Sequence, residues 1–595
     1  MFKYLIYTAI SLIGFTSFGQ SIKYNLKMPK PQNHYYVVEM ELAGFSKKEI
    51  EVKMPVWAPG SYLVREFAKN VDRVTAKDEN GKVLEVNKTS KSAWKIAKGK
   101  AKKVTVSYEV YAFELTVRTS FLDLTHGFVS SAGVFMYVDG YKDSNGKLEV
   151  FPHESFSVIT TALKESAEGV TRDGSKTFDF ENYDHLVDCP IEIGNQEEFS
   201  FTSAGVKHNV AMYGFGNFDI EKLKVDMAKV VQGATDIFGE NPNKEYTFII
   251  HNVVDGQGGL EHCNSTVLSV NRWTYAGSKY ADFLKLVAHE YFHLWNVKRI
   301  RPVELGPFNY DEENYTSLLW VMEGFTSYYE KLILLREGIY TKDQFVSKMF
   351  SSLNYIEGSV GARVQPVSHA SFDAWIKAYR PNENSSNTTQ SYYSGGSVKA
   401  MMLDAMIIKK YNGEKCLDHF LQLLYTKFYK GKNRGFSEEE FKAELAGFLG
   451  QNMDEFFEKY IDGTEIPDYN AIFSPIGLNV SYTGEAKPTI GISMRDSGGK
   501  TIITNVQSGS SAEDAGLSVN DEIIGVNAMR ADKSSLESFF ESVEEGTVMN
   551  VLFAREDELF STELVVKLYE QPKFNYSISE SEKNNKLLHY WLRGK

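Results

Sequence analysis

Hydrophobic positions in the first third of the chain recur in short runs of β-branched and aromatic residues. Turn strings such as Glu79-Asn80-Gly81 and Asp143-Ser144-Asn145-Gly146 separate these runs, and the combination is typical of strands joined by tight turns. The clearest runs are Tyr35–Leu42, Glu49–Met54, Val104–Tyr111 and Phe156–Thr161. The pattern predicts a β-rich, sandwich-like domain over residues 20–205.

From residue 206 the spacing of apolar positions becomes helical, and it stays so to about residue 475. A polar loop at Arg380–Gln390 interrupts this region. The principal predicted helices are Phe218–Phe238, Lys285–Asn296 and Thr316–Gly338. A buried strand is predicted at Glu245–Ile250. They predict an α/β domain over residues 206–475 whose C-terminal half is helical.

A third pattern, of alternating strands and helices, occupies residues 487–570. Strand-like runs at Pro488–Met494 and Val548–Arg555 flank a helical stretch at Ser534–Glu544, which predicts a small separate domain followed by a tail over residues 571–595. The three patterns together describe a multidomain α+β protein. The length of 595 residues agrees with this, because it exceeds what one hydrophobic core supports.

The N-terminus has the three parts of a secretory signal peptide. Lys3 supplies a positive charge, residues 4–15 are apolar, and Ser17-Phe18-Gly19 has the small residues of a cleavage site. We expect residues 1–19 to be removed after Gly19 and the protein to be exported, to the periplasm or outside the cell. The apolar run is shorter than a bilayer span, and no later run reaches that length.

Charge and cysteine content argue against two further classes of protein. The formal charge of −13 is spread along the chain, without the basic patch that is typical of nucleic-acid binding. The three cysteines, Cys189, Cys263 and Cys416, are scattered. Their spacing excludes a cysteine zinc cluster, and their number argues against a disulfide framework, although one pair fits the count.

The helical stretch Lys285–Asn296 contains the string His289-Glu290-Tyr291-Phe292-His293. Residues four apart lie on one face of a helix, which brings both imidazoles side by side as zinc ligands. Glu290 then lies beside the metal without pointing at it, where a general base for a zinc-bound water belongs. The motif predicts a zinc hydrolase and requires a third ligand.

Glu323 is the expected third ligand. It is the one acidic residue in the apolar front half of Thr316–Gly338, where an unpaired buried carboxylate is costly and a metal ion neutralises it. Glu312 and Glu313 also follow the histidines, but they belong to a polar loop segment that we expect to be solvated.

Two other segments each allow two interpretations, and a third has one. The glycines of Gly256-Gln257-Gly258-Gly259, just before Glu261, let a backbone approach a ligand or another strand, but they are also ordinary in loops. Tyr392 and Tyr393 precede a helix and are either donors to a reacting oxygen or half-buried surface aromatics. The string WAPGSYLVREFA, Trp57–Ala68, reads on its own as a Pro-Gly turn among core residues.

Taken together, the strings resemble the gluzincin metallopeptidases, whose fold is thermolysin-like. LLWVMEGFTSYY is similar to the W-x-x-E-G-F string that carries the third zinc ligand in the aminopeptidases of that clan. GGLEH is similar to their G-x-M-E-N string, and YYSGGSVKAMML to their Y-x-K-G-x-x-V segment. With WAPGSY and NYDHLVDCPIEIG, the combination most resembles the glycyl aminopeptidase family that ends in a PDZ domain.

The resemblance implies a complete zinc site. His289, His293 and Glu323 are the implied ligands of one zinc ion per chain, with Glu290 as the general base. Tyr393 is the implied donor to the tetrahedral oxyanion. Two neutral imidazoles and one carboxylate leave a fourth zinc position open for water, as catalytic sites need.

The resemblance also implies a binding site for peptides with a free N-terminus. Glu261 is the implied partner of the substrate's α-amino group, and Gly258 and Gly259 pair with the peptide backbone. The implied activity is removal of N-terminal residues, with small ones such as Gly or Ala preferred.

The chain departs from the family pattern at four points. His293 and Glu323 are separated by more residues than in the best-known aminopeptidases of the clan, which keeps Glu312 as an alternative ligand. His262 replaces the usual Asn after the amine-binding Glu. Gly395 stands where many members have Lys, and Tyr392 competes with Tyr393 for the donor role.

The last domain resembles a PDZ domain. Thr489-Ile490-Gly491-Ile492 matches its carboxylate-binding loop, and SSAEDAGLSVNDEIIGVN its middle segment. Ile490, Gly491 and Ile492 are therefore the residues implied to bind the C-terminus of a peptide added to the sheet edge. The alternative is a module that only packs on the peptidase domain.

Two other functions compete with the aminopeptidase hypothesis. A zinc endopeptidase of the same clan uses the same metal chemistry but has no use for a carboxylate that binds a free amine. A non-catalytic scaffold that binds peptides through the PDZ domain needs no zinc site. Zinc content and the rate on N-acetylated peptides distinguish the three.

Overall fold

The computed structural model describes residues 20–167, 174–484, 486–578 and 585–593. The predicted signal peptide, residues 1–19, lies outside this part. The chain divides into two compact units, and each is described by itself. Unit 1 comprises Met1–Val56 and Glu66–Asn195, and unit 2 comprises Trp57–Arg65 and Gln196–Lys595.

Unit 1 is built of strands, as its alternating sequence predicts. Along β2 (Tyr35–Ala43) every second residue is buried, because side chains of a strand point alternately to its two faces. An eight-stranded sheet, a five-stranded sheet and a four-stranded sheet make up the unit. In sheet order, the eight strands are β15 (Lys164–Glu165), β16 (Lys176–Phe180), β13 (Gly146–Phe151), β1 (Ser21–Lys27), β2, β8 (Lys103–Tyr111), β4 (Val71–Asp78) and β5 (Val83–Leu84).

Two smaller sheets complete unit 1. The five strands are β14 (Val158–Thr161), β17 (Ile191–Gly194), β11 (Gly127–Val129), β10 (Thr119–Leu122) and β9 (Phe113–Thr116). The four strands are β12 (Tyr137–Val138), β3 (Ile50–Lys53), β7 (Ala93–Ile96) and β6 (Val86–Ser90). The short helix α1 (Tyr183–Val187) lies between β16 and β17 in the sequence.

Unit 2 begins with a five-stranded sheet in the order β18, β19, β20, β22, β21. Their bounds are β18 (Glu197–Ser203), β19 (Val206–Tyr213), β20 (Glu245–Val253), β22 (Ser265–Asn271) and β21 (Gly259–Glu261). The three central strands are parallel, whereas the end strand β21 runs antiparallel to β22. Because β18 belongs to this sheet, unit 1 ends at Asn195, earlier than the predicted boundary at residue 205.

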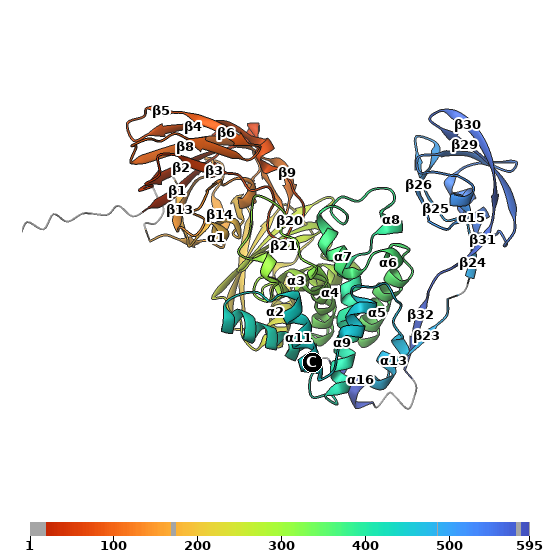
Figure 1. The fold of residues 1–595 in the computed structure, drawn as a ribbon. Coiled ribbons are helices and arrows are strands. Elements are labelled where there is room, and N and C mark those ends of the chain that lie inside the picture. Colours follow the sequence, from red (N-terminus) through yellow and green to blue (C-terminus); the bar gives the residue numbers. More distant parts are fainter. Residues whose placement is uncertain (1–19, 168–173, 485, 579–584, 594–595) are drawn as a thin grey trace, which may run out of the picture. The chain divides into compact units, whose positions relative to one another are not determined.

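Helices follow this sheet in the chain, up to about residue 475 (Figure 1). Those that build the site are α2 (Ile220–Phe238), α3 (Ser278–Phe292), α4 (Leu319–Arg336) and α9 (Tyr392–Lys410). All but one residue of α4 are buried, which explains why apolar residues occur on every side of this helix. The other helices are α5 (Lys342–Glu357), α6 (Gly361–Val364), α7 (Val367–Phe372), α8 (Ser385–Thr388), α10 (Leu417–Leu424), α11 (Glu438–Leu449), α12 (Asp454–Tyr460) and α13 (Tyr469–Phe473).

Residues 487–570, the PDZ-like region of the sequence, have their own apolar core, which includes Ile503, Val526, Leu536 and Met549. Its sheet has the order β25, β26, β27, β29, β30, with β28 paired to β27. Its elements are β25 (Ile492–Ser497), β26 (Lys500–Val506), α14 (Ser511–Asp514), β27 (Glu522–Val526), β28 (Met529–Arg530), α15 (Lys533–Glu541), β29 (Val548–Arg555) and β30 (Glu558–Val565).

The segments on either side of this sheet pair with each other. β23 (Asn479–Tyr482) is antiparallel to β32 (Phe574–Ser577), and β24 (Ala486–Thr489) to β31 (Lys567–Glu570). After β32 the chain ends in α16 (Lys586–Trp591), so the predicted tail contains a strand and a helix. Within the described residues, every helix is too short or too polar to cross a membrane.

Candidate active site

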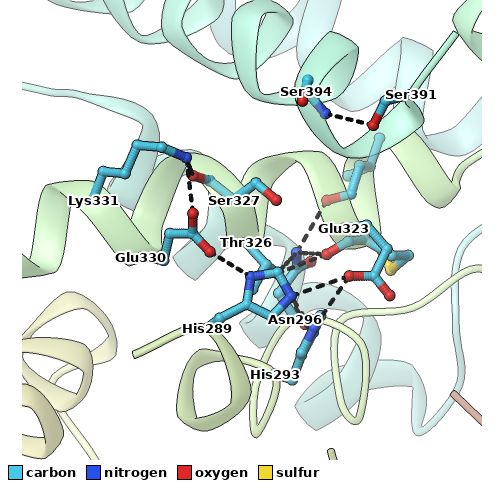
Figure 2. A network of polar contacts seen from close by, with 12 residues as sticks. His289, His293, Asn296, Glu323, Thr326, Ser327, Glu330, Lys331, Ser391 and Ser394 are labelled. Carbon is cyan, nitrogen blue, oxygen red and sulfur yellow. Dashed lines mark hydrogen bonds and ion pairs between the residues drawn. The ribbon is translucent and has the colours of Figure 1, made fainter. Parts of the chain in front are cut away.

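The two histidines of the HExxH string lie at the end of α3. His289 is in the last turn, His293 caps the helix, and their ring centroids are 4.8 Å apart. Glu323, in the first turns of α4, faces both rings (Figure 2). Its Oε2 lies 3.4 Å from Nε2 of His289 and 3.3 Å from Nε2 of His293. The structure therefore brings all three predicted zinc ligands together.

The other nitrogen of each imidazole is held by a different group. Nδ1 of His289 lies 2.7 Å from Oε2 of Glu330, and Nδ1 of His293 lies 2.6 Å from the carbonyl oxygen of Asn296. Both acceptors select the tautomer that carries its proton on Nδ1. The Nε2 lone pairs are thereby left for a metal, as histidine ligands require.

Sequence reasoning missed Glu330. It is buried in α4, and Nζ of Lys331 lies 2.8 Å from its second carboxylate oxygen. Glu330 follows Glu323 by seven residues, which is two helical turns, so both carboxylates point to the same side of α4. That spacing is the signal that identifies it in the sequence.

The donor atoms fit a zinc ion. One ligand atom from each of His289, His293 and Glu323 lies within 4.8 Å of the other two. Two imidazole nitrogens and one carboxylate oxygen are a donor set of catalytic zinc sites. The separations of 3.3–3.4 Å between Oε2 of Glu323 and the two Nε2 atoms are long for direct hydrogen bonds and fit donor atoms that share one metal ion. Burial alone raises the pKa of Glu323, but the two imidazoles hold it well below its usual range.

Glu290 lies next to this cluster and is also buried. Gly259 of β21 lies against it, because a β-carbon built on this glycine would be 2.3 Å from Cδ of Glu290. Burial raises the pKa of Glu290, the neighbouring Glu261 and Glu323 raise it further, and the two histidines lower it. The result is a carboxylate whose basicity is higher than usual.

Glu261 ends the strand β21 at the edge of the sheet. Its carboxylate is buried and lies within 4.8 Å of ligand atoms of Glu290 and His293. β21 pairs with β22 and with no other strand of the described chain. Gly258 has a φ of +121°, a conformation open mainly to glycine, and its carbonyl accepts a hydrogen bond from the Ser269 N–H at 2.9 Å.

Tyr393 lies at the start of α9. Ser391 caps this helix by accepting a hydrogen bond from the Ser394 N–H at 3.2 Å. The ring of Tyr393 is stacked on that of His289 with centroids 6.2 Å apart. Tyr392, its competitor for the donor role, is 1 % exposed and packs beside Tyr393. Tyr393 is thus the half-buried tyrosine next to a predicted zinc ligand.

Glycines set the spacing between the helices that carry Glu323 and Tyr393. A β-carbon on Gly324 would lie 2.3 Å from Cα of Gly396, and one on Gly396 would lie 2.2 Å from the carbonyl oxygen of Trp320. The backbones of α4 and α9 therefore touch with no side chain between them. Both glycines belong to strings singled out in the sequence.

The remaining candidates lie elsewhere or play no evident part. Glu312 is exposed in a loop, where its carboxylate accepts a hydrogen bond from Asn309 at 2.8 Å, so it is not in the metal cluster. His262 follows Glu261 in the sequence and is buried, and it interacts with other residues of the protein. In the PDZ-like region, Ile490 is buried, and Gly491 (φ +78°) directly precedes the end strand β25, which begins at Ile492.

Comparisons with known proteins cover most of the chain. Family models match as a Peptidase M61 N-terminal domain at residues 23–195, an M61 glycyl aminopeptidase at 282–398 and a PDZ domain at 488–566. The search of curated proteins found no match.

Solved structures are similar as well. The crystal structure of an aminopeptidase N family protein from Idiomarina loihiensis has 29% sequence identity and a TM-score of 0.88, and the similarity covers 95% of this chain and 100% of that one. An M1 zinc metallopeptidase from Deinococcus radiodurans has 15% identity and a TM-score of 0.49, over 75% of this chain and 94% of that one.

Proposed function

Because the chain is a zinc aminopeptidase that carries the N-terminal and peptidase domains of the M61 glycyl aminopeptidase family, we propose that it removes single small residues, Gly or Ala, from the N-termini of peptides. The proposed site holds one zinc ion per chain on His289, His293 and Glu323. The proposed catalytic groups are Glu290 and Tyr393.

The observation that carries this proposal is the short distance between two carboxylates. Oxygens of Glu261 and Glu290 lie within 4.8 Å of each other. In a peptide, the α-amino nitrogen and the carbonyl carbon of the first residue are separated by two bonds, about 2.5 Å. An amine paired with Glu261 therefore places the carbonyl of that same residue beside Glu290, and cleavage there releases one residue.

Each residue has a distinct chemical role in the proposed reaction. When bound, the zinc ion supplies a Lewis acid that polarises the scissile carbonyl and acidifies a water. Glu290 accepts the proton of the attacking water and passes it to the leaving amine, a task suited to a carboxylate whose pKa is raised by burial. The Tyr393 hydroxyl donates a hydrogen bond to the developing oxyanion.

Glu261 and the edge of β21 bind the substrate in this proposal. The Glu261 carboxylate pairs with the α-ammonium group, and its buried position strengthens that pairing. The backbone at Gly258 and Gly259 aligns the peptide as an additional strand. Such strand addition suits an end strand that has one partner in the described sheet.

A screen of aminoacyl fluorogenic substrates, with and without a chelator, tests the proposal. We expect Gly and Ala substrates to be cleaved fastest, the chelator to abolish cleavage, and zinc to restore it. N-acetylated peptides should be cleaved far more slowly, because they lack the cationic amine. Equal rates on blocked and free peptides would indicate an endopeptidase, and protein without zinc or hydrolysis would indicate a scaffold.

Two further expectations from the sequence remain proposals. We propose that Ile490, Gly491 and Ile492 bind the C-terminal carboxylate of a peptide that adds to β25, which is the end strand of its sheet. Binding of free but not C-terminally amidated peptides to the full chain tests this. We also propose export after cleavage at Gly19, which mass spectrometry of the mature N-terminus tests.

A further inference from the structure

One string of the sequence has no role in the proposed function: WAPGSYLVR, Trp57–Arg65. Although it interrupts unit 1 in the sequence, it belongs to unit 2. Trp57 is fully buried, its ring lies 5.1 Å from that of Trp375, and its Nε1–H donates to the carbonyl oxygen of Asn309 at 2.8 Å. This anchoring fixes the segment to the peptidase domain.

The segment forms a tight turn. The Ser61 N–H donates to the carbonyl oxygen of Ala58 at 2.9 Å, Pro59 occupies the second position, and Gly60 the third with a φ of +84°. These are the features of a type II β-turn, whose third position favours glycine. After the turn, Tyr62 is buried against the ring of Trp375 at 5.7 Å.

The tip of this turn touches the amine-binding carboxylate. A β-carbon built on Gly60 would lie 2.7 Å from Oε1 and 3.0 Å from Oε2 of Glu261, and 2.7 Å from Cδ1 of the preceding Leu260. The pKa of Tyr62, two residues after Gly60, agrees with a position of this segment near both carboxylates. Burial raises this pKa well above its usual value, and the charges of Glu323 and Glu261 raise it further. On this side of Glu261 the space is filled by main chain.

We propose that the Ala58–Ser61 turn is the wall that closes the substrate site beyond Glu261, and that Gly60 is a specificity-determining residue. Because Gly60 has no side chain, the turn rests against the Glu261 carboxylate without preventing that carboxylate from pairing with an ammonium group. A residue preceding the amine, or an acetyl group on it, would have to occupy the volume of the turn. The inference rests on the proposed function and adds the element that limits removal to one residue.

The test compares Gly60→Ala with Gly81→Ala. Gly81 has nearly the same backbone conformation, with a φ of +79°, but no atom lies within 4 Å of its built β-carbon. Both variants therefore carry the same backbone strain, and only Gly60→Ala pushes a methyl group into Glu261. Binding of glycine hydroxamate and N-acetylglycine hydroxamate by the zinc-loaded full chain reports on the amine site without turnover.

We expect wild type to bind glycine hydroxamate more tightly than the acetylated form. Gly60→Ala should weaken binding of glycine hydroxamate about tenfold or more, and change binding of the acetylated form by less than about twofold. Gly81→Ala should leave both affinities at the wild-type level. Zinc content should be the same in all three proteins.

Equal affinities in Gly60→Ala and Gly81→Ala would overturn the inference, because the turn would then have only a structural role. If Gly60→Ala does not fold, Gly60→Ala combined with Leu260→Ala and Glu261→Ala decides, because both side chains that the added methyl group would meet are then removed. Folding and zinc binding should return in this variant, and their failure to return would also overturn the inference. Failure of the proposed function is separate, since it appears as a wild-type enzyme that cleaves no aminoacyl substrate.

Discussion

At the scale of single residues, the site depends on which atom of each polar group is used. His289 and His293 each use Nδ1 for orientation, to Glu330 and to the Asn296 carbonyl, and present Nε2 to Glu323. Glu290 lies beside them, under Gly259. The arrangement separates the proposed metal ligands from Glu290, the proposed general base.

Replacing Glu290 by Gln should abolish most hydrolysis and preserve the zinc. The amide has nearly the same shape but cannot accept a proton, and general-base catalysis is worth roughly 10²–10⁴-fold in rate. Steady-state kinetics give kcat, and elemental analysis of the same sample gives zinc per chain. A variant with bound zinc and normal turnover would show that Glu290 is not the base.

Replacing Tyr393 by Phe should lower kcat by roughly 10²-fold, because one oxyanion donor contributes about 3 kcal/mol in the transition state. KM should change little, since this hydrogen bond forms mainly in the transition state. Tyr392→Phe is the matched control, and it should keep near-normal kcat. The reverse result would assign the donor role to Tyr392.

At the scale of elements, the site is made by three helices and an edge strand whose spacing glycines set. α3 carries the histidines, α4 carries Glu323 and Glu330, and α9 carries Tyr393. Because α4 and α9 touch through Gly324 and Gly396, the ligand and the donor are held at a fixed separation. Side chains larger than hydrogen at these positions have no space.

Replacing Gly396 by Ala should separate α4 from α9. Its β-carbon would meet the carbonyl oxygen of Trp320 at 2.2 Å, and such overpacking costs about 1–3 kcal/mol. We expect a lower thermal midpoint and weaker zinc retention against a chelator, because Trp320 lies one turn before Glu323.

Gly447→Ala is the control for this change. Gly447 lies inside α11, and no atom lies within 4 Å of its built β-carbon. Alanine should therefore stabilise this helix, by about 0.5–1 kcal/mol. A Gly396→Ala enzyme as stable and as zinc-retentive as wild type would show that the contact of α4 with α9 is not tight.

At the scale of the whole molecule, the end of the chain returns to the peptidase domain. Trp591 of α16 is 2 % exposed, and its Nε1–H donates to the Tyr328 hydroxyl of α4 at 2.9 Å. Its ring also lies 5.6 Å from that of Phe345. The last helix therefore completes the core behind the helix that carries Glu323.

Replacing Trp591 by Ala should destabilise the peptidase domain by about 3–5 kcal/mol, the usual cost of emptying a buried tryptophan site. Differential scanning calorimetry should show a lower midpoint for the transition that is sensitive to zinc. Lys586→Ala, at an exposed position of the same helix, is the control and should leave the midpoint unchanged. An unaltered transition in Trp591→Ala would mean that α16 does not contribute to this core.

Several features were predictable from the sequence because they depend on local periodicity and spacing. The alternation in Tyr35–Leu42 predicted β2, and the helical spacing of Phe218–Phe238 and Thr316–Gly338 predicted α2 and α4 to within a few residues. Helical geometry also brings His289 and His293 together. The predicted fold class, the family resemblance and the enzyme class are confirmed by the matching family models and the similar crystal structure.

Other features were decided only by tertiary structure, because they join residues distant in the sequence. Sequence reasoning placed Glu323 as a ligand on the cost of burying its charge, but left Glu312 as an alternative that only the packing of α4 against α3 excludes. The contact of Gly60 with Glu261 links positions some two hundred residues apart, and no local pattern records it. The sequence by itself determined which side chains are the candidates for the chemistry. The folded chain decided the distances between them, and the proposed end of the substrate site depends on those distances.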